Sequence, residues 1–285
     1  MQGCGINRRF FYFCYMISFP NAKINLGLHI TEKRPDGFHN LETVFFPVNW
    51  SDGLEFVEAK EFQFTTSGIT ISGDPELNLV VKAYRLLQKD FGLPSLKIHL
   101  HKEIPFGAGL GGGSSDAVSM LLMLNKSFNL SLSDDDLLQY AGCLGSDCPF
   151  FIHNKPMYAT GRGEILTPVN IRLNGMFILM VKPAVEVSTA KAFQYVVPKK
   201  SEVSLPELLN LPVFDWKNKL INQFESSVFQ QYPEIMQVRQ KLYEQGAVYA
   251  SMSGSGSCVF GLFLDDPTEI KNHYPLPFLT FVQKF

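Results

Sequence analysis

The sequence has little charge of either sign and no excess of one sign over the other. Charged residues make up 18% of its 285 residues, hydrophobic residues make up 46%, and the net charge is -2 with a pI near 6.3. This composition excludes a disordered chain and supplies enough apolar material for a sizeable buried core. The absence of a basic excess argues against binding to nucleic-acid phosphates, so we expect no nucleic-acid partner.

Cysteines are few, and their spacing fits no metal or disulfide pattern. The count is odd and no Cys-x-x-Cys pair occurs, so neither a disulfide framework nor a zinc site is predicted. We expect small, reduced thiols in a cytoplasmic protein. The five are Cys4, Cys14, Cys143, Cys148 and Cys258.

No stretch of the sequence is long and apolar enough to predict a transmembrane helix, and we expect no membrane partner. The longest uncharged stretch, 245–264, is interrupted by four glycines and four serines. Near the start, Arg8 and Arg9 precede a short apolar run that imitates a signal peptide, but no small-residue cleavage site follows. An alternative is translation from Met16, with residues 1–15 as a dispensable upstream extension.

The hydrophobic pattern predicts an α+β fold without repeats or low-complexity segments, because strands and helices mix without regular alternation. A boundary near 165–175 would divide the chain into domains at 16–170 and 171–285. Residues 149–169 are expected to form short strands and turns. Strands are expected at 22–31, 41–48, 54–64, 97–104 and 176–181, and on both sides of 253–257. Helices are expected from Asn78 to Gly92, over 117–124, after Ser133, from Ser188 or Thr189 to Tyr195, and from Pro233 to Gly246.

A glycine-rich loop between an expected strand and an expected helix is the most informative stretch. Five glycines within residues 107–113 remove side-chain bulk, so backbone N–H groups can approach an anion closely. The helix that follows presents free N–H groups and a positive dipole end, which favour phosphate. The alternative is a flexible turn. The predicted phosphate-binding residues are Pro105, Phe106, Gly107, Ala108, Gly109, Leu110, Gly111, Gly112, Gly113, Ser114 and Ser115.

Two other nucleotide-binding patterns fit this loop poorly. Gly107, Gly109 and Gly112 match the dinucleotide fingerprint, but Pro105 interrupts the preceding strand. The acids found about 20 residues later, 134–136, open a helix rather than end a strand. A Walker A loop is excluded because no lysine follows the glycines.

Three further features of the sequence are candidates for the same site as this loop. A second glycine-rich segment, 251–258, is either a hairpin turn or a second wall of the same site. Lys23 interrupts an apolar strand, so it is either an edge lysine or a functional one. Asp147, in the segment Gly145 to Phe151, is either a turn-forming aspartate that ends a helix or a catalytic carboxylate.

Four segments, taken in order, resemble the GHMP kinase superfamily: AKINLGLHI, PFGAGLGGGSSDA, GSDCPFF and SMSGSGSCVF. The resemblance extends over nearly the whole chain from about Met16. Two segments between these motifs, RPDGFHNLETVF and GRGEILTPV, make the resemblance more specific. Together with the four motifs they resemble the subfamily that phosphorylates a cytidylyl-methylerythritol in non-mevalonate isoprenoid synthesis.

The resemblance implies a ribosomal-S5-like N-terminal domain and a ferredoxin-like C-terminal domain. It also implies ATP as donor, Mg²⁺ as counter-ion, and transfer to the 2-hydroxyl of a small-molecule cytidine diphosphate derivative by a monomer or weak homodimer. Lys23 and Asp147 fall on the catalytic positions and 105–115 on the ATP-phosphate segment. No Mg²⁺ ligand is assigned, although Ser115 and Asp116 are close enough to the loop to be candidates. The positions that would bind the acceptor are Asn25, Phe38, His39, Thr189 and Phe193.

One departure and two alternatives accompany this resemblance. The family often has tyrosine where this chain has Phe38, which removes a hydroxyl group but keeps a stacking face. The alternatives are another GHMP kinase, of the homoserine or mevalonate type, and a nucleotide-binding module without catalysis. The presence of both Lys23 and Asp147 argues against the second alternative.

Overall fold

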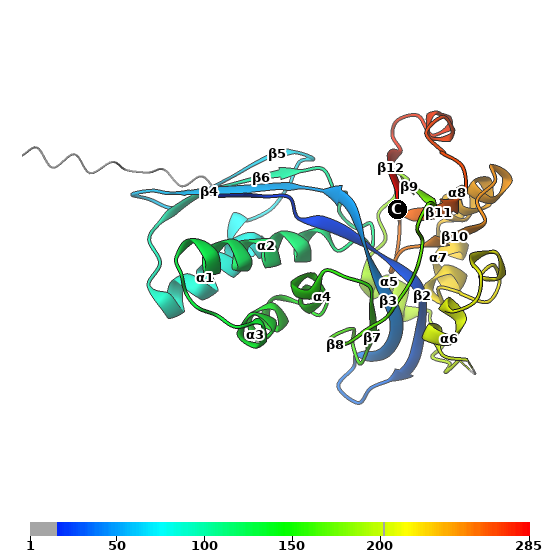
Figure 1. Ribbon diagram of the computed structural model, residues 1–285, viewed down its shortest axis with the longest axis horizontal. Helices are drawn as coiled ribbons and strands as arrows, with labels where there is room; N and C mark the ends of the chain where they lie inside the picture. The colour runs from blue at the N-terminus through cyan, green and yellow to red at the C-terminus, as the bar shows by residue number, and fades with distance from the viewer. Residues whose placement is uncertain (1–15, 202) are drawn as a thin grey trace, which may run out of the picture.

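The described part of the chain forms three four-stranded sheets with helices packed against them, which confirms the predicted α+β class. This computed structural model describes residues 16–201 and 203–285; the predicted extension at 1–15 lies outside the described residues, together with Cys4 and Cys14. In Figure 1 the sheet that contains β4, β5 and β6 lies with helices α1 (Leu79–Phe91) and α2 (Gly112–Ser127) at one end of an elongated molecule. Two long strands, β2 (Asn21–Lys33) and β3 (His39–Ser51), connect this end to the sheet that contains β9 to β12 at the other.

The first sheet covers the longest helices of the N-terminal half. Buried and more exposed residues alternate along its strand β6. Leu96, Ile98 and Leu100 are buried on the inner face, and Lys102 is buried at the next position of the same alternation. The helix α1 begins after an Asn78 side-chain cap and ends at Gly92 in the left-handed conformation, both as predicted. The strands are, in spatial order, β1 (Met16–Ser18), β4 (Gly53–Glu58), β6 (Leu96–Lys102) and β5 (Gln63–Gly68), and the helices are α1 (Leu79–Phe91) and α2 (Gly112–Ser127).

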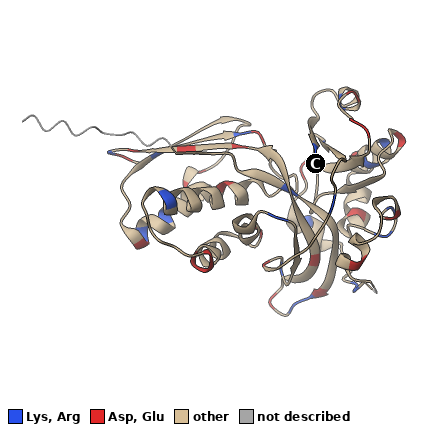
Figure 2. Ribbon diagram, in the orientation of Figure 1, with Lys and Arg blue, Asp and Glu red and all other residues tan. Residues whose placement is uncertain are grey.

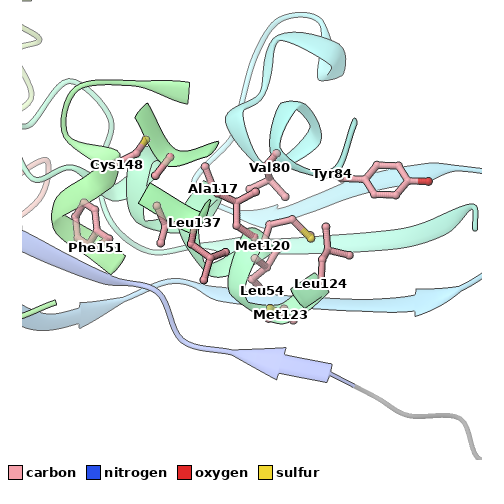
Figure 3. Packing of buried hydrophobic residues seen from close by; sticks show 14 of the residues in the cluster. Leu54, Val80, Tyr84, Ala117, Met120, Met123, Leu124, Leu137, Cys148 and Phe151 are labelled. Carbon is pink, nitrogen blue, oxygen red and sulfur yellow. The ribbon is translucent and has the colours of Figure 1, made fainter. Parts of the chain in front are cut away.

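The core beneath this sheet joins α1 and α2 to two shorter helices, α3 (Asp134–Leu144) and α4 (Cys148–His153). Ser133 and Asp136 form a reciprocal capping box that starts α3. Figure 3 shows side chains of these helices in one packed cluster, with Leu54 of β4 drawn beside Met123 and Leu124 of α2. This packing fixes the start of α4 close to α2.

The second sheet places alternate residues of β2 on opposite faces. Ala22, Ile24 and Leu26 are fully buried in one cluster, so Lys23 and Asn25 point to the other face. Beyond them the register with β3 shifts at Gly27, which has a φ of +69°. The strands are β2 (Asn21–Lys33), β3 (His39–Ser51), β7 (Met157–Thr160) and β8 (Ile165–Pro168).

The third sheet is buried on both faces. In β9, Ile178 and Met180 join one hydrophobic cluster while Leu179 and Val181 join another, which explains the uninterrupted apolar run. Its strands are β10 (Tyr249–Met252), β11 (Val259–Phe263), β9 (Phe177–Lys182) and β12 (Leu279–Lys284). The helices of the C-terminal half are α5 (Thr189–Gln194), α6 (Leu205–Leu209), α7 (Phe224–Gln231) and α8 (Pro233–Glu244). Short 3-10 turns lie before α1 at η1 (Pro75–Leu77) and in the C-terminal half at η2 (Val213–Asp215) and η3 (Ile270–His273).

Several predicted boundaries were wrong. The segment 54–64 divides into β4 and the start of β5, and α2 begins at Gly112, two residues before Ser114, where the helix after the glycine loop was expected to open. The segment 149–169 contains the expected short strands, β7 and β8, but it begins in a helix, α4, because Pro149 starts the helix and the buried Phe150 and Phe151 hold it against the core. The strand β1 precedes the expected first strand, and α6 and α7 were not predicted.

The division into domains at residue 170 stays a prediction. One buried cluster contains Ile24 and Phe260, so hydrophobic packing continues from the first half of the chain into the second. Figure 2 shows acidic and basic residues interspersed over both halves. Among the described residues no helix is long and apolar enough to cross a membrane, and Cys143, Cys148 and Cys258 are free thiols.

Candidate active site

Lys23 lies at the meeting point of β2 and the first glycine loop. Its backbone N–H donates to the carbonyl oxygen of Leu110 at 2.9 Å, and its Nζ donates to the carbonyl oxygen of Gly109 at 3.0 Å. Nζ also donates to Asn25 Oδ1 at 2.7 Å, two residues along the same face of β2. The functional interpretation of Lys23 therefore fits its position better than that of a snorkelling edge lysine, since the residue is 3% exposed.

Asp147 faces Lys23 from the start of α4. The two charges are 3.5 Å apart, between Nζ and Oδ2. Asp147 occupies the N-cap position but makes no side-chain cap hydrogen bond, so its carboxylate is not committed to the helix. Burial lowers the pKa of Lys23 below its ordinary value, and the neighbouring Asp147 carboxylate partly opposes that shift.

At Gly109 the first glycine loop approaches other backbone so closely that a side chain would not fit. Gly107, Gly109 and Gly111 all have positive φ, between +56° and +73°. A Cβ on Gly109 would lie 2.0 Å from the carbonyl oxygen of Ser253 in the second loop. The two glycine-rich segments are therefore adjacent, as the second-wall interpretation expects.

The start of α2 leaves backbone donors free for an anion. Gly111 caps the helix without a side-chain hydrogen bond, and the first N–H groups of a helix have no intrahelical partner. Ser115 N–H is already bonded to the carbonyl oxygen of Gly111 at 3.0 Å. Ser115 and Asp116 are 3% and 2% exposed, so neither candidate Mg²⁺ neighbour lies open to solvent.

A buried charge cluster supports this loop from below. Lys102 Nζ donates to Asp52 and, at 2.8 Å, to Asp116 Oδ2, while Asp52 Oδ1 accepts the N–H groups of Glu103 and Ile104 at 2.6 and 2.8 Å. This cluster of Lys102, Asp52 and Asp116 therefore connects the end of β6 to the first turn of α2. Burial raises the pKa of Asp116 to about 8 against the opposing effect of Lys102. Since two carboxylates share one ammonium, a proton on Asp116 balances the charge.

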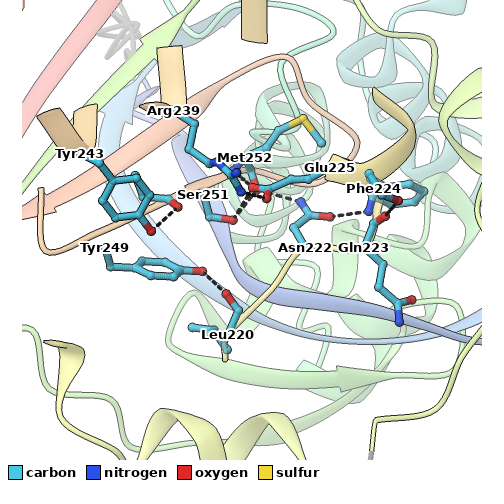
Figure 4. A network of polar contacts seen from close by, with 12 residues as sticks. Leu220, Asn222, Gln223, Phe224, Glu225, Arg239, Tyr243, Tyr249, Ser251 and Met252 are labelled. Atoms are coloured by element: carbon cyan, nitrogen blue, oxygen red, sulfur yellow. Dashed lines mark hydrogen bonds and ion pairs between the residues drawn. The ribbon is translucent and has the colours of Figure 1, made fainter. Parts of the chain in front are cut away.

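A second polar network, drawn in Figure 4, holds the second glycine loop. Asn222 Nδ2 donates to the carbonyl oxygens of Met252 and Gly254, both at 2.8 Å. Glu225, which pairs with Arg239, accepts from Met252 N–H at 2.8 Å. Burial raises the pKa of Glu225. Asn222 and Glu225 thus hold the second glycine loop in place. The same loop contacts the first one, because Ser253 Oγ donates to the carbonyl oxygen of Gly109 at 2.9 Å.

A cleft of about 840 Å³ leads away from Lys23 and Asp147. At its far part the rings of His39 and Phe193 are stacked, with centroids 4.9 Å apart and planes inclined by 20°. Phe193 also contacts Phe224 edge to face, at 4.8 Å between centroids. Phe38 lines the same cleft and is 56% exposed, and the guanidinium of Arg162 lies over its ring.

The structure brings the predicted catalytic and acceptor-binding residues together in one cleft. Thr189 lines the cleft and shares a hydrogen bond of 3.1 Å with Ser255 Oγ, while Asn25 Nδ2 donates to Thr43 Oγ1 at 2.9 Å. Of the predicted phosphate loop, only Gly109 and Gly111 line this cleft. The ring stacked on Phe193 is that of His39 rather than that of Phe38.

Three residues that support the two glycine loops, Lys102, Asp52 and Asn222, were not predicted as site residues. Lys102 gave a signal, because a charged residue occupied an inward position of an alternating strand. Asp52 lies in a segment that looked like a plain turn, and Asn222 gave no signal at all. Their roles depend on contacts between distant segments.

Two family models match the chain. The model described as "GHMP kinases N terminal domain" matches residues 78–155, which include α1, the first glycine loop and α4. The model described as "GHMP kinases C terminal" matches residues 206–275, which include the second glycine loop. Both glycine loops described above therefore fall within matched regions.

Comparison with individual proteins points to one kinase within this broader family. A 4-diphosphocytidyl-2-C-methyl-D-erythritol kinase of Bacteroides fragilis is 56% identical over 252 residues, covering 87% of this chain and 92% of the relative. A crystal structure of 4-(cytidine 5'-diphospho)-2C-methyl-D-erythritol kinase superposes with a TM-score of 0.79 at 29% identity, covering 94% of this chain and 98% of that one.

A more distant structure shows only how widely the fold is shared. A homoserine kinase from Cytophaga hutchinsonii has a TM-score of 0.63 at 16% identity, covering 93% of this chain and 94% of that one. The relative in Bacteroides fragilis is far more similar in sequence and nearly equal in extent. The chain belongs to the GHMP kinases and, among them, to the 4-diphosphocytidyl-2-C-methyl-D-erythritol kinase family.

Proposed function

We propose that the protein transfers the γ-phosphoryl group of ATP to the 2-hydroxyl of 4-diphosphocytidyl-2-C-methyl-D-erythritol, in the non-mevalonate route to isoprenoid precursors, with Lys23 and Asp147 as its catalytic residues. The observation that carries this proposal is the 3.5 Å pair of Lys23 Nζ and Asp147 Oδ2 where the glycine loop meets the cleft. A phosphate donor on the loop and an acceptor in the cleft would meet at this pair.

Asp147 accepts the proton of the acceptor hydroxyl as that oxygen forms its bond to the γ-phosphorus. The bond from the γ-phosphorus to the β–γ bridging oxygen breaks, and ADP leaves. Lys23 lies beside the Asp147 carboxylate and offsets negative charge on the moving phosphoryl group. Positioning and charge stabilisation dominate phosphoryl transfer, and a general base contributes ~10²–10⁴-fold.

The triphosphate binds along residues 105–115 and the start of α2. The N–H groups of Gly112, Gly113 and Ser114 have the free-donor positions of a helix start, where phosphate is favoured. A Cβ built on Gly111 would lie 3.2 Å from Lys23 Cε. The loop and the lysine side chain therefore lie side by side in the site.

Magnesium fits this site as an ion bound to ATP. Among residues 16–201 and 203–285 no group of three or more His, Cys, Asp or Glu could hold a metal ion alone. Mg²⁺ carried by ATP would be held mainly by phosphate oxygens and water, so it would need few protein carboxylates, and Asp147 stays available as the base. When bound, it supplies neutralisation of the phosphate charge.

The cytidine end of the acceptor occupies the aromatic part of the cleft, with Phe38, His39, Thr189 and Phe193 in contact. Burial and the nearby Lys33 lower the pKa of His39, which favours its neutral ring at pH 7. A neutral imidazole donates at one nitrogen and accepts at the other, as recognition of a cytosine edge requires. Asn25, bonded to both Lys23 and Thr43, orients the acceptor beside the reacting hydroxyl.

The test is a panel of acceptors incubated with ATP and Mg²⁺, with ADP release and phosphorylated product both measured. We expect turnover with 4-diphosphocytidyl-2-C-methyl-D-erythritol and none above background with homoserine or mevalonate. Turnover of another acceptor alone would favour the other GHMP kinases, and ATP binding without any turnover would favour the nucleotide-binding module.

Three finer expectations are part of this proposal and rest on the sequence. They are a cytoplasmic location, a monomer or weak homodimer, and two domains divided near residue 170. Size-exclusion chromatography with light scattering at micromolar concentration tests the second directly.

A further inference from the structure

A positively charged side chain with no role so far lines the cleft between its aromatic part and the catalytic pair. Arg162 belongs to the turn between β7 and β8. Its Cζ lies 5.2 Å from the centroid of the Phe38 ring. The next residue, Gly163, is beside the catalytic carboxylate, since a Cβ built on it would be 4.0 Å from Asp147 Oδ1. Arg162 therefore stands between the two ends of the acceptor site.

The order of residues along the cleft matches the order of groups along the proposed acceptor. In that molecule a diphosphate separates the cytidine from the methylerythritol carbon that bears the reacting hydroxyl. In the cleft Arg162 separates Phe38, at the cytidine part, from Asp147, at the reacting part. A molecule bound in this direction brings its two phosphate charges past the guanidinium.

The surrounding charges leave Arg162 able to accept an anion. Its neighbour Glu164 lies 3.6 Å from Nε, a long ion pair, and accepts the backbone N–H of Arg162 at 2.5 Å. Asp36, the other acid near it, is bonded to Arg34 at 2.9 Å. The side chain of Arg162 is 41% exposed, so it can reorient toward a ligand.

We propose that Arg162 binds the diphosphate of the acceptor and so selects substrates that carry one. This inference rests on the proposed function. A guanidinium donates two parallel hydrogen bonds to phosphate oxygens, which gives both affinity and orientation. Lys33 is the other cation lining the cleft outside the catalytic pair, and it adjoins His39 rather than Asp147.

The test compares two ligands that differ only in the diphosphate, CDP and cytidine, by calorimetric titration in wild type and Arg162→Gln. We expect CDP to bind roughly 10–100-fold more weakly to the variant, the loss of a charged hydrogen-bonded contact. Cytidine binding should change less than about twofold, since the stacking residues remain. Arg172→Gln, at an exposed arginine outside the cleft, is the matched control and should leave both affinities unchanged.

Two results would overturn the inference: equal weakening of CDP and cytidine, or a selective loss of CDP binding in Lys33→Gln and not in Arg162→Gln. Thermal melting of each variant identifies a folding defect, and Arg162→Lys, which keeps the charge but not the fork, should then give an intermediate loss of CDP affinity. Turnover is measured separately. Wild type that binds CDP through Arg162 but does not phosphorylate the cytidylyl acceptor would contradict the proposed function alone.

Discussion

Lys23 and Asp147 form an ion pair whose two members differ in exposure. Nζ and Oδ2 are 3.5 Å apart, yet the lysine side chain is 4% exposed and the aspartate side chain 39%. Hydrogen bonds to Asn25 and Gly109 fix the ammonium, while the carboxylate faces the cleft. This asymmetry suits a base that must reach an incoming hydroxyl and a cation that must stay in place.

A side chain on the first glycine loop should damage ATP binding. Gly111 has a φ of +69°, and a Cβ there would lie 3.0 Å from Phe151 and 3.2 Å from Lys23. Gly111→Val should therefore raise the KM for ATP at least tenfold and lower kcat, because backbone approach to phosphate is blocked and Lys23 is displaced. Steady-state kinetics with ATP varied provides the measurement.

The matched control for this variant is Gly142→Ala in α3. A Cβ at Gly142 meets nothing within 4 Å, and the residue lies in a regular helix. Its ATP kinetics should equal those of wild type. If Gly111→Val behaved like this control, the phosphate role of the loop would be wrong.

Removing the Phe193 ring should separate the two substrates. Phe193→Ala should weaken binding of the cytidylyl acceptor by roughly 10–100-fold, because base–aromatic stacking contributes ~1–3 kcal/mol. It should leave the KM for ATP nearly unchanged. Since Phe193 also packs against His39 and Phe224, melting temperature is recorded alongside the kinetics. Equal damage to both substrates would mean that the ring is structural.

The buried cluster of Lys102, Asp52 and Asp116 should make stability depend on pH. The pKa of Asp116 is raised from 3.8 to about 8, so between these pH values the folded state binds more protons than the unfolded state. The free energy of unfolding must then fall as pH rises through this window. We expect the melting temperature to decline from pH 5 to pH 8 in wild type, and less steeply in Asp116→Asn. Parallel curves would show that Asp116 does not titrate there.

Local signals in the sequence were sufficient for much of the scaffold. Alternation in 22–31 placed Lys23 among apolar neighbours, and the Asn78 and Gly92 signals bounded α1 to the residue. The α4 helix was missed because six residues with two adjacent phenylalanines show no clear period. Only the packing of Phe150 and Phe151 in the core settles their conformation.

Contacts between distant segments set the remainder of the site. His39 and Phe193 stack although they come from β3 and α5, and no local pattern pairs them. Asn222 supports a loop 30 residues later through two carbonyl oxygens. Such roles become visible only when the fold brings the segments together.

The most direct measurement is single-turnover phosphoryl transfer to 4-diphosphocytidyl-2-C-methyl-D-erythritol by Asp147→Asn. Asparagine keeps the size of the side chain but cannot accept the hydroxyl proton as a carboxylate does. We predict a loss of ~10²–10⁴-fold in the transfer rate, with ATP affinity and melting temperature close to those of wild type. A variant that binds ATP and transfers the phosphoryl group at the wild-type rate would contradict the assignment of Asp147 as the catalytic base.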